Sequence, residues 1–263
     1  MTYLQALIIA VIEGITEFLP VSSTGHMILA DALLKVENKD FAKTFEIVIQ
    51  LGAILSVVVL YFKKFLAGFN IYLKLGVAFI PTGVIGFLAY KTIKHYLFNP
   101  FTVSISLIAG GIVLILLDRW SEKKESQFKS VEEITFASAF KIGLIQCLSM
   151  IPGVSRSAAT IFGGVSAGFN RAQAAEFSFL LAVPTMLAAS GYDLLKEKDS
   201  IHSDDLTLLL FGAAIAFIVA LLAIRGFINL LTRYGFRHFG YYRIILGTVF
   251  LIYALSSGLQ LTD

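Results

Sequence analysis

The stretch that decides the fold reads E-G-I-T-E-F-L-P-V-S-S-T-G-H and occupies residues 13–26, after an apolar run that begins at Leu4. Glu13 and Glu17 would share one face of a helix, because they are four residues apart. Pro20 then interrupts the helix, since proline lacks an N–H and clashes with the preceding turn. A run of small polar residues and a histidine follows: Ser22, Ser23, Thr24, Gly25 and His26.

The composition predicts a polytopic membrane protein. Of 263 residues, 57% are hydrophobic and only 15% are charged, which is too little charge for the surface of a soluble domain of this size. No polar stretch is long enough to fold separately, so we expect one membrane domain over residues 1–263. The single cysteine, Cys147, excludes an intramolecular disulfide.

Six apolar stretches are long enough to cross about 30 Å of hydrocarbon, which takes about 20 helical residues. They are residues 41–62, 75–90, 101–117, 172–195, 206–224 and 241–257. The basic residues that we place in cytoplasmic loops include Arg119, Arg171, Arg233, Arg237 and Arg243. The positive-inside rule then predicts that both termini lie outside.

Two further apolar regions, residues 3–34 and 134–169, are each broken in the middle by proline and small polar residues. Irregular backbone at membrane depth is tolerated only where it is buried in protein or lines a cavity. We therefore interpret both regions as re-entrant helical hairpins. The predicted fold class is all-α, with six transmembrane helices and two re-entrant hairpins.

The two halves of the chain resemble each other. Each broken region is followed by a span with an early glutamate, Glu46 in the first half and Glu176 in the second, and then by two more spans. One hairpin and three spans give an odd number of crossings, so the second copy must be inverted relative to the first. We predict inverted-topology repeats over approximately residues 1–118 and 134–258.

The two breaks form a candidate anion site. A new helix begins at each break, with Ser22 or Ser23 as the cap of one and Ser155 as the cap of the other. Helix N-termini present free N–H groups and a partial positive charge, which bind anions. Arg156 adds a planar guanidinium that matches phosphate oxygens. Inverted repeats would bring these groups and the imidazole of His26 together near the middle of the membrane.

Two glutamates beside a phosphate require a cation. A charge at the centre of a membrane costs about 2.5–3.5 kcal/mol on insertion scales, and Glu13 and Glu17 would also repel the anion. Their carboxylates are hard oxygen ligands of the kind that Mg²⁺ or Ca²⁺ prefers, so we predict that both bind such a metal. Ser23 could be a covalent nucleophile, or His26 could act as a base on water, and the sequence does not choose between them.

Each feature also has a purely structural explanation. The two glutamates could relay protons or brace the fold, the Ser/Thr run could pack a helix break, and the histidine could be structural. Arg156 could pair with Glu13 or Glu17 without any ligand. Glu46 and Glu176 could have no role beyond bracing the hairpin backbones. The whole constellation favours a site, because anion donors and cation ligands recur at matched breaks.

The chain resembles the undecaprenyl-diphosphate phosphatase family, also called bacitracin-resistance proteins. The matching motifs are E-G-I-T-E-F-L-P-V-S-S-T-G-H (residues 13–26), P-G-V-S-R-S-A-A-T (152–160), F-E-I-V-I-Q-L-G (45–52) and E-F-S-F-L-L-A-V-P (176–184). The resemblance covers the whole chain, although Ala158 stands where the family pattern has glycine. It implies hydrolysis of undecaprenyl diphosphate to undecaprenyl phosphate and inorganic phosphate, which recycles the lipid carrier for cell-wall synthesis and confers bacitracin resistance.

The resemblance also implies roles for individual residues. Catalytic or metal-binding roles would fall to Glu13, Glu17, Ser23, His26 and Arg156. Substrate-binding roles would fall to Ser22, Thr24, Gly25, Gln50, Ser155 and Ser157. It further implies dependence on Mg²⁺ or Ca²⁺, a homodimer, no nucleic-acid partner, and a site that opens to the outer face of the bacterial plasma membrane.

A transporter or flippase for a polyprenyl phosphate lipid is the competing hypothesis, because inverted repeats with broken helices are typical of secondary transporters. The type-2 phosphatidic-acid phosphatases share S-T-G-H and S-R, but they need a second histidine several residues after the arginine. Residues 157–164 read S-A-A-T-I-F-G-G, so we reject that class.

Overall fold

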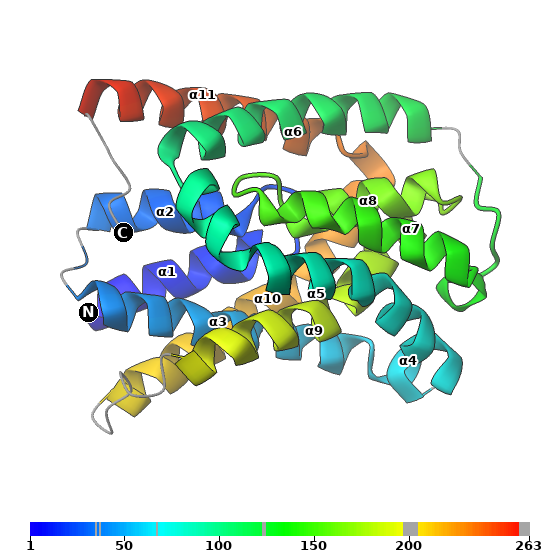
Figure 1. Ribbon diagram of the computed structural model, residues 1–263, viewed down its shortest axis with the longest axis horizontal. Helices are drawn as coiled ribbons and strands as arrows, with labels where there is room; N and C mark the ends of the chain where they lie inside the picture. Colours follow the sequence, from blue (N-terminus) through cyan, green and yellow to red (C-terminus); the bar gives the residue numbers. More distant parts are fainter. Residues whose placement is uncertain (35, 37, 67, 123–124, 197–204, 258–263) are drawn as a thin grey trace.

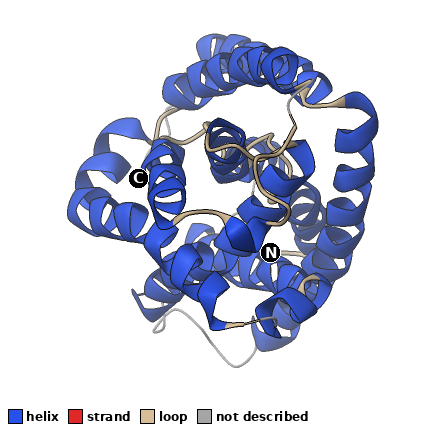
Figure 2. Cartoon of the chain, turned by 90° about the vertical axis from the view of Figure 1, so that its right-hand side faces the viewer, coloured by secondary structure: helices blue, strands red, loops and turns tan. Residues whose placement is uncertain are grey.

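The computed structural model describes residues 1–34, 36, 38–66, 68–122, 125–196 and 205–257. Within these residues every regular element is a helix and there is no strand (Figure 2). Six helices of the described ranges are long and apolar enough to cross a membrane: α3 (Lys39–Leu60), α5 (Phe69–Leu97), α6 (Pro100–Ser121), α9 (Arg171–Lys196), α10 (Leu206–Tyr234) and α11 (Arg237–Ser257). The prediction of an all-α, multi-pass membrane protein with six spans is confirmed.

Four shorter helices occupy the two broken regions: α1 (Tyr3–Thr16), α2 (Ser23–Leu34), α7 (Phe136–Gln146) and α8 (Arg156–Ser166). The longest, α1, has 14 residues. It is therefore about 21 Å long at 1.5 Å per residue, which is less than the hydrocarbon thickness of about 30 Å. Figure 1 shows α1 and α2 in the left half of the bundle and α7 and α8 in the right half.

Three short elements complete the described chain: α4 (Phe62–Leu66), η1 (Val131–Glu133) and η2 (Cys147–Met150). The second predicted span was too short, because α5 begins at Phe69 and continues through Pro81 to Leu97. Proline is tolerated inside membrane helices where neighbouring groups satisfy the freed backbone carbonyl.

Helices from the two halves pack against one another. Helix α6 packs along α11, α3 packs along α10, and α3 also contacts α9. In addition, α1 packs against α10, and α7 packs against α5. Small residues allow these close approaches, since a Cβ on Gly111 of α6 would come within 2.6 Å of the carbonyl oxygen of Gly240 in α11. This packing brings the α1–α2 and α7–α8 breaks to the centre of the bundle.

Candidate active site

The two breaks have the same local geometry. Ser22 and Ser155 both have positive φ, 71° and 75°, which is uncommon for a residue with a side chain. The hydroxyl of Ser22 accepts a hydrogen bond of 3.4 Å from the N–H of Gly25, and the hydroxyl of Ser155 accepts one of 3.2 Å from the N–H of Ala158. A serine therefore caps each new helix, as the sequence predicts.

The two breaks are also in direct contact. The hydroxyl of Ser157 donates a hydrogen bond of 2.8 Å to the backbone carbonyl of Phe18. The guanidinium of Arg156 lies over the Phe18 ring, 5.6 Å from its centre, and Phe179 packs edge-on against that ring at 5.7 Å. Ser157, which the sequence analysis assigns to substrate binding, here uses its hydroxyl to join the breaks.

Glu17 lies at the centre of the site and has two partners. Its Oε2 accepts a hydrogen bond of 2.6 Å from the Ser23 hydroxyl, and its Oε1 forms an ion pair of 3.0 Å with Nη2 of Arg156. Nη1 of Arg156 donates to the backbone carbonyl of Ser178 at 3.1 Å. Nε of Arg156 is buried and has no hydrogen-bond partner among the residues that the structure describes. Because buried donors are nearly always paired, this N–H is available to an anion that enters the site.

Glu13 lies one helical turn before Glu17 and is 1% exposed. It is within electrostatic reach of Glu17, Glu46 and Arg156, and its buried Oε1 has no hydrogen-bond partner in the described ranges. In the described part of the chain, no three His, Cys, Asp or Glu side chains are grouped to hold a metal ion. Mg²⁺ commonly needs only one or two carboxylates together with substrate phosphates. The free oxygen of Glu13 beside Glu17 fits that smaller ligand set.

His26 is held by two partners. Its Nδ1 lies 2.7 Å from the backbone carbonyl of Ser22, and its Nε2 lies 2.6 Å from the hydroxyl of Tyr242. The two rings are stacked, with centroids 5.6 Å apart and an interplanar angle of 9°. His26 could therefore act on a substrate only after Tyr242 released its Nε2.

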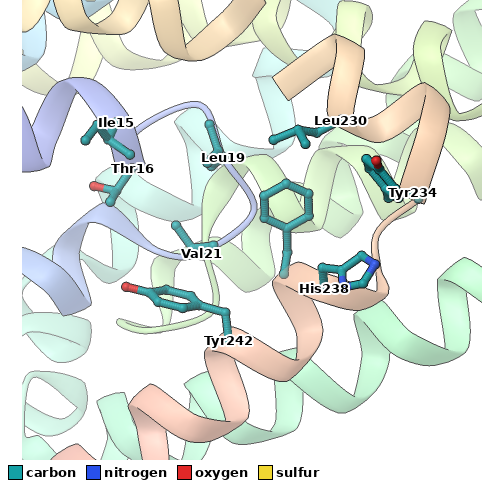
Figure 3. A pocket seen from close by; sticks show the side chains of 10 residues that line it. Ile15, Thr16, Leu19, Val21, Leu230, Tyr234, His238 and Tyr242 are labelled. Carbon is teal, nitrogen blue, oxygen red and sulfur yellow. The ribbon is translucent and has the colours of Figure 1, made fainter. Parts of the chain in front are cut away.

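An apolar cavity of about 580 Å³ lies beside Tyr242. Figure 3 shows its walls: the first break lies on one side, and α10 and α11 lie on the other. The lining residues include Thr16, Leu19, Val21, Leu230, Tyr234, His238 and Tyr242. The cavity thus reaches from the α10–α11 connection to the loop that separates Glu17 from Ser22.

Comparison with known proteins assigns the family. The model of the bacitracin resistance protein BacA family matches residues 6–249. The chain belongs to this family. BacA-family relatives named undecaprenyl-diphosphatase include one from Flavobacterium psychrophilum, 54% identical with 96% of each chain covered. Others come from Bdellovibrio bacteriovorus, 51% identical with 96% of each chain covered, and from Aquifex aeolicus, 48% identical with 97% of this chain and 100% of the relative covered.

Other residues that the sequence analysis singles out have separate positions in this BacA-family chain. Gln50 accepts a hydrogen bond of 3.1 Å from the Ser190 hydroxyl, which joins α3 to α9. Gly25 is buried, and Thr24 is exposed. Glu46 and Glu176 occupy matching places in sequence but have different neighbours: Glu46 lies near Asp31, and Glu176 forms an ion pair of 3.2 Å with Lys64.

One functional candidate in the BacA-family chain was missed. The placement of Arg243 in a loop is wrong, because this residue is fully buried within α11. It donates to five backbone carbonyls, those of Pro20, Ser106, Leu107, Gly153 and Val154. The signal was present in the sequence, since an ionisable residue inside a membrane helix is costly and marks a functional site by default. By contrast, Arg119, Arg171, Arg233 and Arg237 lie in the first or last turn of their helices, and their cytoplasmic location stays a prediction.

Proposed function

We propose that this chain is an integral-membrane undecaprenyl-diphosphatase, which hydrolyses undecaprenyl diphosphate to undecaprenyl phosphate and inorganic phosphate. The observation that carries the proposal is the series Ser23–Glu17–Arg156, connected through the buried Glu17 by contacts of 2.6 and 3.0 Å. It combines a nucleophile, a base and a phosphate-binding guanidinium. The names of the relatives support the same substrate, and hydrolysis would return the lipid carrier to cell-wall synthesis and underlie bacitracin resistance.

The geometry favours Ser23 as the nucleophile. Arg156 and the N-termini of α2 and α8 bind the terminal phosphate and stabilise its developing charge. Glu17 accepts the Ser23 proton, Oγ attacks the terminal phosphorus, and the anhydride bond breaks as undecaprenyl phosphate leaves with that proton. Water then attacks the phosphoserine, Glu17 takes the proton of the water, and Ser23 recovers its hydrogen as inorganic phosphate departs. His26 stabilises the first break through the contact of its Nδ1 with the backbone carbonyl of Ser22.

A divalent cation, Mg²⁺ or Ca²⁺, completes this proposal. Glu13 and Glu17 would hold it, and the unpartnered Oε1 of Glu13 supports that role. When bound, such an ion would neutralise charge on the phosphate oxygens and offset the repulsion between the substrate and both carboxylates.

The proposed architecture consists of two re-entrant hairpins, α1–α2 and α7–α8, in one membrane domain of inverted repeats, at about residues 1–118 and 134–258. The similar φ values and caps of Ser22 and Ser155 support this architecture. The cross-packing of the halves supports it too, because α1 packs against α10 of the second half and α7 packs against α5 of the first half. We place the domain in the bacterial plasma membrane as a homodimer, with both termini and the site opening outside. Labelling of single cysteines from each side, in a Cys147→Ser background, tests the orientation, and chemical cross-linking tests the dimer.

A lipid transporter or flippase is the alternative, and the apolar cavity favours it. The cavity lies on the Leu19–Val21 side of the first break and extends to the α10–α11 connection, which we place in the cytoplasm. A lipid chain there would approach the break from the side opposite to the proposed outer opening.

Release of inorganic phosphate from undecaprenyl diphosphate by the purified protein with Mg²⁺ tests the phosphatase function. Ser23→Ala should lose at least about 10³-fold in rate, as for removal of other catalytic nucleophiles. The matched control is Ser166→Ala, an exposed serine of α8, which should keep the wild-type rate. No phosphate release by the wild-type protein, or full activity of Ser23→Ala, would contradict the proposal. If the Ser23→Ala protein moved a labelled undecaprenyl phosphate from one leaflet of a vesicle membrane to the other, the transporter alternative would be supported.

A further inference from the structure

Arg243 is a fully buried residue that contacts both helix breaks at once. Its Nη1 donates to the backbone carbonyl of Pro20 at 3.1 Å and to that of Val154 at 3.0 Å. Its Nη2 donates to the carbonyl of Gly153 at 2.7 Å. One guanidinium nitrogen therefore bridges the first break and the second.

The same side chain is fixed to α6. Its Nε donates to the carbonyl of Leu107 at 3.3 Å, and Nη2 also donates to that of Ser106 at 3.1 Å. Gly110 provides the space for this arrangement, because a Cβ there would overlap with the guanidinium. Arg243 is thus held rigidly between α6, α11 and the two breaks, and its planar fork suits five fixed acceptors better than an ammonium group would.

The charge of Arg243 has only neutral partners. Among the described residues it forms no salt bridge, and its five acceptors are carbonyl oxygens. A charge in so apolar a place acts strongly on its surroundings, because the local dielectric constant is low. The C=O and N–H of one peptide unit point in opposite directions. The bond to the Val154 carbonyl therefore turns the N–H of Ser155 away from Arg243, at the N-terminus of α8.

Both breaks contain strained backbone that needs such support. Ser22 and Ser155 have positive φ, a conformation that costs about 1–3 kcal/mol per residue and persists only where surrounding contacts impose it. Three of the five carbonyls that Arg243 binds belong to residues one or two positions before these serines.

We propose that Arg243 is a positioning residue: it holds the N-termini of α2 and α8 in register for one phosphate, and its uncompensated charge attracts the anion to that place. This inference rests on the proposed phosphatase function. Arg243 acts through Ser23 and Arg156 and does not touch the substrate.

Three variants test this role in the full-length protein: Arg243→Gln removes the charge, Arg243→Lys keeps the charge without the planar fork, and Arg237→Gln is an exposed control on the same helix. Arg243→Gln should lower kcat about 10²-fold, the usual effect of misplacing groups that are held around the reacting atoms. It should also weaken inhibition by inorganic phosphate at least about tenfold, with Arg243→Lys intermediate. Wild-type kcat and phosphate inhibition in Arg243→Gln would overturn the inference.

Hydrogen exchange separates positioning from simple loss of folding and does not depend on turnover. In wild-type protein, inorganic phosphate should slow exchange in residues 17–26 and 150–159 together. In Arg243→Gln both segments should exchange faster and lose the response to phosphate, while α3 and α9 stay protected. A change in one segment only, or throughout the chain, would contradict the inference. If wild-type protein shows this response but releases no phosphate from the lipid, the phosphatase function fails and the role of Arg243 in anion binding stands.

Discussion

Glu17 and Arg156 form an ion pair of 3.0 Å although 139 residues separate them in the sequence. Their side chains are only 6% and 11% exposed. Glu17 directly precedes the first helix break, and Arg156 directly follows the second. The pair therefore connects the two halves of the chain at the place where both breaks meet. A buried charge that loses its partner is strongly unfavourable, which makes the pair important for folding as well as for chemistry.

Removal of one partner should destabilise the protein more than removal of both. Arg156→Met leaves Glu17 as a buried charge without its partner and should lower the free energy of unfolding by about 3–5 kcal/mol. Adding Glu17→Gln should restore most of that loss, yet both variants should lack phosphatase activity. Urea unfolding in detergent micelles and phosphate release measure the two effects. Additive losses of stability would show that the pair is not coupled.

Hydrolysis should depend on a divalent metal ion, and the affinity for that ion should depend on the Glu13 carboxylate. We expect a chelator to abolish hydrolysis and Mg²⁺ or Ca²⁺ to restore it. Glu13→Gln should raise the metal concentration for half-maximal rate at least about tenfold, because a ligand oxygen is lost. Glu125→Gln, at an exposed position, is the control and should titrate like the wild-type protein. Identical metal titrations for Glu13→Gln and the control would remove Glu13 from the metal site.

At position 143, where α7 contacts α5, no residue larger than glycine should be tolerated. In Gly143→Ala the new Cβ would overlap with the backbone carbonyl of Ala78, and such overpacking typically costs about 1–3 kcal/mol. A Cβ on Gly226 in α10 would have no neighbouring atom of the described residues within 4 Å. Gly226→Ala should therefore be neutral or stabilising, because alanine favours helices. Thermal unfolding of both variants checks this; equal midpoints would mean that α7 can shift away from α5.

An ion pair outside the membrane spans should give a pH-dependent part of the stability. Lys64 and Glu132 are 2.7 Å apart. Burial alone raises the pKa of Glu132, but hydrogen bonds from Lys64 and Ser130 together bring that pKa below its ordinary value. Burial alone lowers the pKa of Lys64, but its contacts with Glu132 and Glu176 together bring that pKa above its ordinary value.

The pair should therefore stabilise the fold between about pH 5 and pH 10. The contribution of Glu132 is present above its unfolded pKa of about 4.3 and is lost as the pH falls through its lower folded pKa. The contribution of Lys64 is present below about 10.4 and is lost as the pH rises through its higher folded pKa. Lys64→Met should cost at most about 1 kcal/mol at pH 7, and this cost should become smaller as the pH falls toward 3. A difference from wild type that is the same at both pH values would rule out the ion pair as its cause.

Much of the local structure was predictable from the sequence. The apolar runs predicted six spans, and the described part of the chain contains six helices of that kind. The caps were predictable because Ser22 and Ser155 satisfy N–H groups three residues ahead, and such short-range hydrogen bonds depend only on nearby residues. The sequence also predicted that Arg156 could pair with Glu13 or Glu17, but it could not choose between two carboxylates on one helical face.

The sequence by itself determined the helices, the breaks, the caps and the membership of the BacA family. Only the tertiary structure decided that Arg156 pairs with Glu17, that Tyr242 binds His26, and that Arg243 joins both breaks. The physical reason is the distance along the sequence between the residues that interact. Helix formation and burial follow from residues within a few positions and from non-directional apolar contact, whereas a hydrogen bond between distant segments requires placement to within a few tenths of an ångström. That placement depends on how α6, α10 and α11 pack around the breaks.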